Sequence, residues 1–344
     1  MSVVGRLRGW FWRRLGLASR DDVTALSGRV DQLIKDVRQL GARAEKRSVR
    51  ELAGLAAAAE RLETQLGTPT RGLDGRLRHI ERNVSALIRR GYVDQDTLSF
   101  PHNVLSQRFH LWSQNEEDGI TLALFKLVGA PHRTFVELGA GVNGGNCGML
   151  AEVCGWRGLM VDGSDARADK LAARFGRFGV ATAGTWITAE GVNELLTSHG
   201  MQGEIDLFSL DIDGSDYWVW KALDVVSPRV VIVEFNPAFG SKRAVTVQYD
   251  PAFDRARFKS LTPHFYGASL AAFVKLGASK GYRLVLVEPR GANAYFLRDD
   301  VAGEAIPALP AERAHTSPAL DPGPLFDIIA SEQLPMVDLD TSAG

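Results

Sequence analysis

Carboxylates follow directly after an apolar stretch near the middle of the chain. The segment "DLFSLDIDGSDYWVW", residues 206–220, begins as a buried strand and then reaches Asp211 and Asp213. Alternation places these two side chains on the same side of an extended chain. The next apolar stretch ends in Glu234 and Asn236. Hard cations such as Mg²⁺ select carboxylate and amide oxygens, so these four residues predict a divalent-metal site.

The same carboxylates have two alternative roles. Asp211 is a candidate general base for a reacting hydroxyl, since it would lie at the end of a strand. Asp213 or Asp216 is suited to cap a helix that begins near Tyr217. We assign Asp216 to that cap and keep the metal, the base and the cap as alternatives for the other acids.

Two further features near residue 260 are relevant to an acceptor. His264 lies in a polar loop before a predicted helix and is a second candidate general base, with an ordinary loop histidine as the alternative. The long loop before it contains Tyr249, Asp250 and Arg255. Long loops in compact domains are often functional lids, so this loop is expected to hold a polar acceptor.

A glycine-rich turn and a later acidic residue are typical of a nucleotide site. The segment "TFVELGAGVNGGN", residues 134–146, reads as a strand that runs into the turn, and "GLMVDGSD" ends a second strand in Asp162. Glycines let the backbone approach a ligand, and the carboxylate accepts hydrogen bonds from ribose hydroxyls. The third glycine of the dinucleotide fingerprint is missing, which disfavours a nicotinamide dehydrogenase. A plain tight turn is the alternative.

The elements that must position these residues alternate between strand and helix. This pattern predicts an α/β fold with a doubly wound, mostly parallel sheet over residues 93–300, in which ligands bind at the carboxyl ends of the strands. Residues 282–300 are expected to form a terminal hairpin. Helices are predicted over residues 115–128, 166–175, 192–198 and 269–280. The Pro- and Ala-rich tail, residues 301–344, is expected to be loosely ordered.

These strand ends together resemble a known family. "FVELGAGVNGGN", "GLMVDGSD" and "DLFSLDIDGSDYWVWKAL" are similar to the successive strand ends of class I S-adenosylmethionine-dependent methyltransferases. "SQNEEDGI" and the region from "AVTVQYDPAFDR" to "NAYFLRDD" resemble, more narrowly, an uncharacterised branch of the FkbM-type group. The resemblance covers about residues 100–300. It implies a Rossmann-like methyltransferase fold and O-methyl transfer to a sugar, a glycan precursor or a natural product.

The resemblance also implies a set of cofactor contacts. The glycine turn would face the methionine part of S-adenosylmethionine, Asp162 the ribose, and the segment at Trp186 the adenine. The residues expected to bind the cofactor are Glu137, Gly139, Gly141, Asn143, Asp162, Gly163, Ser164, Trp186 and Ile187. Asn143 stands where many methyltransferases have glycine. This departure supports an alternative reading, a catalytically silent scaffold whose N-terminal arm recruits partners.

The first 92 residues form a separate, basic arm. Residues 1–90 carry 19 lysines and arginines against 10 acidic residues, whereas the remainder carries 21 against 31. Valine and leucine alternate at a and d positions, which favours a parallel two-stranded coiled coil and hence a homodimer. The seam consists of Val23, Leu26, Val30, Leu33, Val37 and Leu40. The alternative is a helix that folds back on the body.

The extreme N-terminal segment bears on where in the cell the protein is expected. "RLRGWFWRRLGL" is suited to lie on an anionic membrane surface, with a solvated terminus as the alternative, and nucleic-acid binding is disfavoured because no recognised binding module is present. No apolar run approaches about 18 residues, and the segment lacks the apolar region and cleavage site of a signal peptide. With Cys147 and Cys154 as its cysteines, the chain is expected in the reducing cytoplasm, with membrane association left open.

We expect residues 1–92 to set the oligomeric state, because valine at a and leucine at d favour burial of the seam against a second copy of the same helix. Light scattering should give a larger oligomer for the full chain than for a chain that begins at residue 92. The same number of protomers in both species would mean that the seam packs within its own chain.

Overall fold

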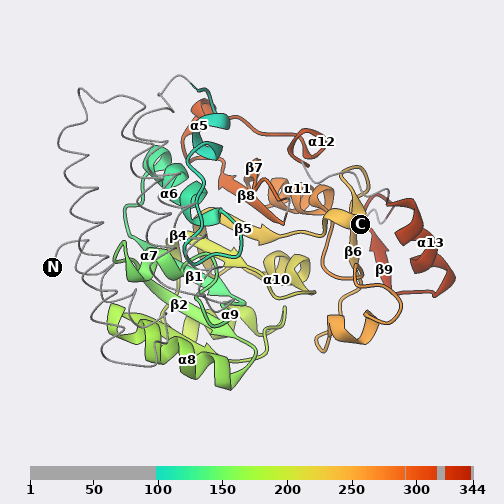
Figure 1. Cartoon of the computed structure of the whole chain (residues 1–344), viewed down its shortest axis with the longest axis horizontal. Coiled ribbons are helices and arrows are strands. Elements are labelled where there is room, and N and C mark those ends of the chain that lie inside the picture. Colours follow the sequence, from blue (N-terminus) through green and yellow to red (C-terminus); the bar gives the residue numbers. More distant parts are fainter. Residues whose placement is uncertain (1–97, 291, 316–321, 342–344) are drawn as a thin grey trace, which may run out of the picture. The chain divides into compact units, whose positions relative to one another are not determined.

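The computed structural model describes residues 98–290, 292–315 and 322–341 (Figure 1). The predicted arm, residues 1–92, lies outside the described residues, so its coiled coil, its dimer and its membrane contact stay predictions. Among the described residues, no helix combines the length and the apolar character needed to cross a bilayer.

A seven-stranded sheet forms the centre of the described chain, in the order β3-β2-β1-β4-β5-β8-β7. Its strands are β1 (Thr134–Leu138), β2 (Arg157–Asp162), β3 (Val180–Gly184), β4 (Gly203–Leu210), β5 (Val226–Glu234), β7 (Tyr282–Val287) and β8 (Asn293–Arg298). The strands β1 to β5 pair in parallel, and β8 is antiparallel to both β5 and β7. The sheet confirms the predicted doubly wound, mostly parallel α/β fold and its terminal hairpin.

Helices flank this sheet. The helices of the described residues are α5 (His102–Leu105), α6 (Glu117–Val128), α7 (Gly148–Glu152), α8 (Asp165–Phe175), α9 (Val192–Ser198), α10 (Asp216–Ala222), α11 (Leu270–Ser279), α12 (Ala311–Ala314) and α13 (Gly323–Ser331), of which α13 packs beside a smaller, second sheet. The four helices predicted from the sequence are confirmed as α6, α8, α9 and α11, with ends that agree within two residues. Apolar residues of α9, α10 and α11 join one core cluster with the sheet, and the fully buried ring of Trp220 lies edge-on against Phe296 in it.

The register of the central strands brings the chemically important positions to one edge. Leu138 at the end of β1 pairs with Leu210 at the end of β4, and Leu210 pairs with Val233 near the end of β5. Glu234 then pairs with Asn293, where antiparallel β8 begins. The last four residues of β4 are fully buried, as in a strand covered on both faces. The segments that follow β1, β4 and β5 are therefore neighbours in space.

A second, two-stranded sheet lies beside the main one. In it β6 (Val245–Val247) pairs antiparallel with β9 (Met336–Asp338), and Figure 1 shows this pair next to α13. The described residues of the C-terminal tail thus form helices and a paired strand, unlike the loosely ordered tail expected from composition. The reason is that Leu325 and Ile329, four residues apart on α13, are buried in an apolar cluster with residues such as Phe239.

Candidate functional site

A pocket of about 660 Å³ opens at the carboxyl edge of the main sheet. Most of the residues predicted to bind a cofactor line it: Gly139, Gly141, Asp162, Gly163, Ser164, Trp186 and Ile187. The loop after β4 contributes Asp211, Ile212, Asp213 and Ser215. Another wall comes from Arg167 and from Phe253 to Ala256 with Lys259, and of these residues the sequence indicated only Arg255. The structure therefore brings the glycine turn, the acid after β2 and the acids after β4 into one space.

The glycine turn lies close to the chain after β4. A Cβ atom added to Gly139, which has a φ of +89°, would lie 1.6 Å from the backbone oxygen of Asp211. Only glycine fits this close approach. The next glycine, Gly141, donates its backbone N–H to Asp162 Oδ2 at 3.0 Å. The turn is therefore held between the end of β4 and the acid at the end of β2.

Asp162 is almost fully buried at the wall of the pocket. Its Oδ1 accepts a hydrogen bond from the Ser164 N–H at 2.9 Å, and Arg167 Nη1 lies 3.6 Å from its Oδ2. A carboxylate has about four lone-pair positions, so both oxygens keep the capacity to accept a further bond. The carboxylate thus stays available to ligand hydroxyls.

Trp186 forms the neighbouring wall. Its side chain is 55% exposed, although its Nε1–H donates to the Pro251 carbonyl at 2.8 Å. The ring lies against Gly163, where an added Cβ would be 3.0 Å from Trp186 Cε3. Together with Ile187, the indole gives the pocket an apolar surface beside Asp162, and a flat aromatic ligand would fit such a surface.

Two residues predicted to contact the cofactor lie behind the glycine turn and do not line the pocket. Glu137 is buried and accepts hydrogen bonds from the Cys147 N–H and the Ser209 hydroxyl, both at 3.0 Å. Burial is the main reason that its pKa rises to about 8. Asn143 donates its Nδ2–H to the Trp112 carbonyl at 2.5 Å. Both side chains shape the turn from behind.

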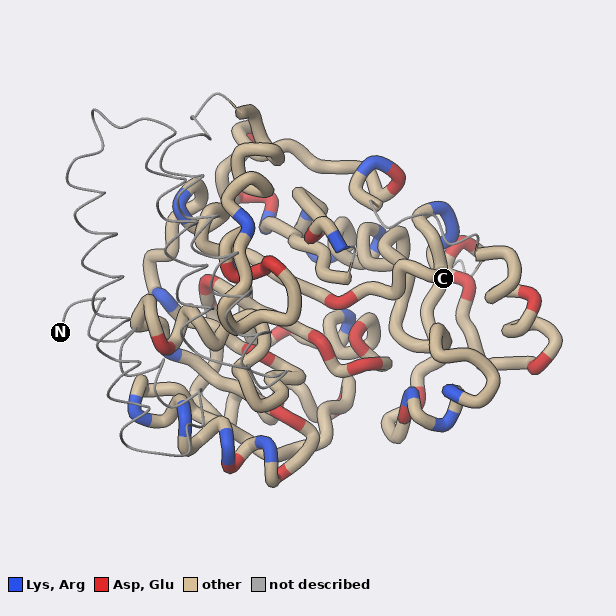
Figure 2. The backbone as a smooth tube through the Cα atoms, in the orientation of Figure 1, with Lys and Arg blue, Asp and Glu red and all other residues tan. Residues whose placement is uncertain are grey.

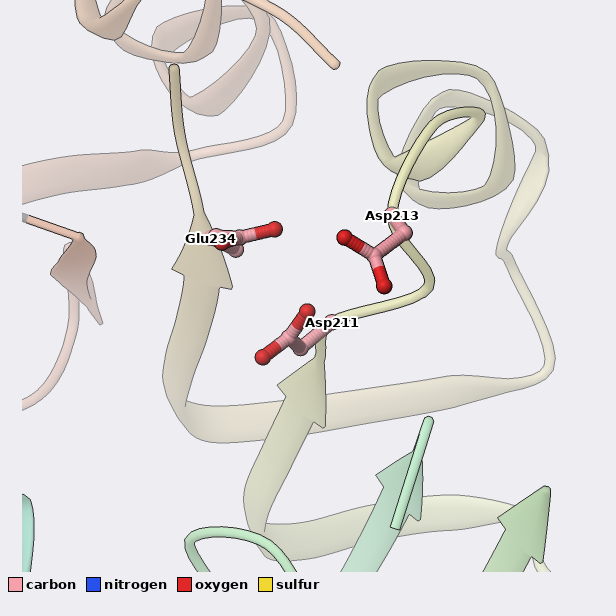
Figure 3. A group of neighbouring side chains, drawn as sticks. All are labelled: Asp211, Asp213 and Glu234. Atoms are coloured by element: carbon pink, nitrogen blue, oxygen red, sulfur yellow. The ribbon is translucent and has the colours of Figure 1, made fainter. Parts of the chain in front are cut away.

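Three carboxylates gather at the ends of β4 and β5. Asp211, Asp213 and Glu234 each present one oxygen within 4.8 Å of the others, and Figure 3 shows the three side chains turned toward a common space. Burial first, then the charges of Asp216 and Asp213, raise the pKa of Asp211 to about 7. Burial and the charge of Asp211 raise the pKa of Glu234 well above its usual range. Like charges so placed require a proton or a cation between them.

Asp213 and Asp216 have different partners. Asp213 has a φ of +60° and forms an ion pair with Arg255, whose Nη1 lies 2.7 Å from its Oδ1. Asp216 is buried at the first position of α10, and its carboxylate accepts the backbone N–H groups of Ile212 and Gly214 at 2.8 and 2.9 Å. The prediction that Asp216 caps the helix is therefore wrong: Ser215 is the N-cap residue, without a side-chain cap hydrogen bond, and Asp216 fixes the loop after β4.

The remaining two predicted residues have other surroundings. Asn236 is fully buried, donates its amide to the carbonyls of His264 and Tyr266 at 2.6 and 2.9 Å, and accepts the Ala238 N–H at 3.0 Å. The structure thus gathers three of the four predicted metal ligands, and the fourth binds backbone groups. His264 is exposed and does not line the pocket.

The charged residue opposite the acids comes from the long loop before His264. Arg255 begins the 3-10 turn η4 (Arg255–Phe258), and its Cζ lies 3.6 Å from the centroid of the Tyr266 ring. Figure 2 shows acidic residues where β4 and β5 end and basic residues in this turn. The sequence indicated Arg255 as a residue that could hold the acceptor substrate. It gave no signal for Tyr266, whose contact with Arg255 arises only from the tertiary fold.

Comparisons with known proteins give no family for this chain. No family model matches the sequence, and no curated protein matches it. Among solved structures, the methyltransferase domain of bacterial CtHen1-C is 17% identical over 53% of this chain and 97% of its own, with a TM-score of 0.35.

Two further solved structures show a similar level of likeness. An O-methyltransferase from Bacillus cereus in complex with SAH is 16% identical over 70% of this chain and 96% of its own, with a TM-score of 0.33. A putative hemolysin from Streptococcus thermophilus is 13% identical over 62% and 73%, with a TM-score of 0.35. At these identities and TM-scores the likeness identifies neither a reaction nor a substrate. The mostly parallel, helix-flanked sheet is itself a doubly wound α/β arrangement.

We expect the stability of the protein to fall as the pH rises from about 5 to 8, in part because of Glu137. The pKa of a glutamate in water is 4.5, whereas that of Glu137 in the folded chain is about 8. Between these values the folded state keeps a proton that the unfolded chain has lost, so raising the pH favours unfolding, by up to about 1.4 kcal/mol per pH unit for one such group.

The replacement Glu137→Gln should flatten this pH dependence in chemical unfolding experiments, because the amide carries no charge. Glu194→Gln, at an exposed position of α9, is the matched control and should leave the slope unchanged. An identical slope in all three proteins would contradict the assignment of the raised pKa to Glu137.

Proposed function

We propose that the protein is an S-adenosylmethionine-dependent O-methyltransferase that acts on a hydroxyl of a sugar, a glycan precursor or a natural product. The observation that carries this proposal is the single pocket that joins two sets of groups. One end has the glycine turn, Asp162 and Trp186, and the other end has Asp211 and Asp213, which group with Glu234 at the end of β5. The first set suits a nucleoside cofactor, and the second suits the activation of a hydroxyl.

The residues present at the first end fit S-adenosylmethionine. Gly141 leaves room for the methionine part against the backbone because it carries no side chain, and Gly139 lets the turn lie beside Asp211. Asp162 would accept hydrogen bonds from the ribose hydroxyls through its remaining lone pairs. The exposed face of Trp186, with Ile187, would contact the adenine. When bound, the cofactor supplies an electrophilic methyl group on a sulfonium.

The residues at the other end supply the proton acceptor. When a hydroxyl oxygen forms its bond to the methyl carbon, the carbon–sulfur bond breaks and the hydroxyl proton must leave. Asp211 lines the pocket, and its pKa of about 7 gives a mixture of acid and base near neutral pH, which suits general-base catalysis. Such a displacement depends mainly on alignment of the reacting groups.

A divalent cation is the second part of the proposal. Asp211, Asp213 and Glu234 would supply three oxygen ligands, and such a cation would lower the pKa of an acceptor hydroxyl bound to it. Its charge would also offset the repulsion that, after burial, raises the pKa of Asp211 and Glu234. Asn236 is not among the ligands that we propose, because its amide is bound to backbone groups.

We expect S-adenosylhomocysteine to raise the melting temperature, since a ligand that binds only the native state stabilises it by mass action. Asp162→Asn should remove most of this shift, because it deletes the charge that would hold the ribose hydroxyls. Asp169→Asn, at an exposed position of α8 that does not line the pocket, is the control and should keep the shift. Absence of binding to the unaltered protein would favour the silent scaffold instead.

The roles of the carboxylates are separated by Asp211→Asn and by a chelator. If the three acids bind a cation, the variant should bind S-adenosylhomocysteine normally but lose methyl transfer, and the chelator should inhibit the unaltered enzyme. If Asp211 is the general base alone, the variant loses activity and the chelator has no effect. Full activity in the presence of the chelator would therefore contradict the metal proposal. Full activity of Asp211→Asn would contradict both roles of Asp211, as a metal ligand and as a general base.

A further inference from the structure

The segment 248–264 forms one side of the pocket, and we call it the roof. Both of its ends are fixed at its base, where Val247 N–H donates to the Gly267 carbonyl at 3.0 Å and Gln248 N–H donates to the Pro335 carbonyl at 2.8 Å. In Figure 1 this segment is the orange loop that follows β6 of the two-stranded sheet. Five of its residues line the pocket.

Beyond its base, the roof contacts the two ends of the pocket. At the cofactor end, the Pro251 carbonyl accepts the Trp186 Nε1–H at 2.8 Å. At the carboxylate end, the Phe253 ring lies directly over Gly214, where an added Cβ would be 2.2 Å from Phe253 Cδ1. Because the roof reaches both walls, a ligand that extends from Trp186 to the carboxylates lies beneath it.

The roof is also held by Tyr249, whose hydroxyl accepts the Ala189 N–H at 3.0 Å and donates to Glu190. A further contact is the ion pair between Arg255 of the roof and Asp213 of the loop after β4. The guanidinium is held for this contact, because it lies on the Tyr266 ring and its Nη2 donates to the Pro263 carbonyl at 3.2 Å. The Asp213 side chain is 64% exposed and that of Arg255 is 29% exposed. Water and salt therefore reach the pair, so it can open at low cost.

We propose that Arg255 is a positioning residue that latches the roof over the cofactor. Opening of the Arg255–Asp213 pair would let the roof move for cofactor exchange, and its closure would return Arg255 to Asp213 beside the carboxylate cluster. This inference rests on the proposed cofactor pocket. A latch that is closed equally with and without ligand slows association and dissociation alike, so it changes the rates of binding while leaving the affinity almost unaltered.

The test is stopped-flow binding of S-adenosylhomocysteine in metal-free buffer. Arg255→Gln removes the charge and should raise both rate constants about three- to tenfold, with a change in Kd of less than about twofold. Asp213→Asn should raise both rate constants by a similar factor. The double variant should raise them no further than either single variant does. Arg257→Gln is the control, since Arg257 is on the same turn, pairs with Asp250 at 3.7 Å and does not line the pocket.

Hydrogen exchange of the free protein gives an independent measurement. The roof amides should exchange faster in Arg255→Gln than in Arg257→Gln, and salt should accelerate exchange in the unaltered protein but not in Arg255→Gln. Gly214→Ala should also accelerate exchange of the roof amides, because the added methyl group displaces Phe253. In this variant Arg255 and Asp213 are unchanged.

Two outcomes would overturn the latch: rates and exchange in Arg255→Gln equal to those of Arg257→Gln, or single effects that add in the double variant. Failure of S-adenosylhomocysteine to bind any of these proteins would instead contradict the proposed function, and hydrogen exchange would still decide whether the latch exists.

Discussion

The close approach of Gly139 to the backbone of Asp211 is the constraint on which the site depends. Parallel pairing of β1 with β4 brings the two chain segments together, and the absence of a side chain at Gly139 lets them remain so. The turn that follows can then reach Asp162 through the Gly141 N–H. One backbone contact therefore fixes the distance between Asp162 and the carboxylates after β4.

The charges of the site follow from this arrangement. Bringing Asp211 beside Glu234 and Asp213 is unfavourable unless something positive is shared among them. Within the described chain, Arg255 supplies a positive charge to Asp213, and a proton or a metal ion must serve the other two. The site is thus prepared for positively charged species, and the sulfonium that we propose as the methyl donor is one of them.

Local patterns in the sequence were sufficient for the sheet, for four helices and for most of the pocket wall. Strand ends and glycines are set by nearby residues, so Gly139, Asp162 and Asp211 could be placed together in advance. The orientations of the Glu137 and Asn236 side chains could not be predicted in this way, because each depends on hydrogen bonds to segments distant in the sequence. Composition also concealed the packing of the tail, which depends on burial against β6 and η3 (Pro237–Phe239).

The closed base of the roof has an evolutionary consequence. Because residues 247 and 267 are hydrogen-bonded to each other, the chain between them leaves and rejoins the fold at nearly one point. Insertions, deletions or exchanges within such a loop need not disturb the strands on either side. The roof can therefore change in sequence and length while the strands, the glycine turn and Asp162 keep their places, so this one segment can alter the shape of the pocket without altering the sheet.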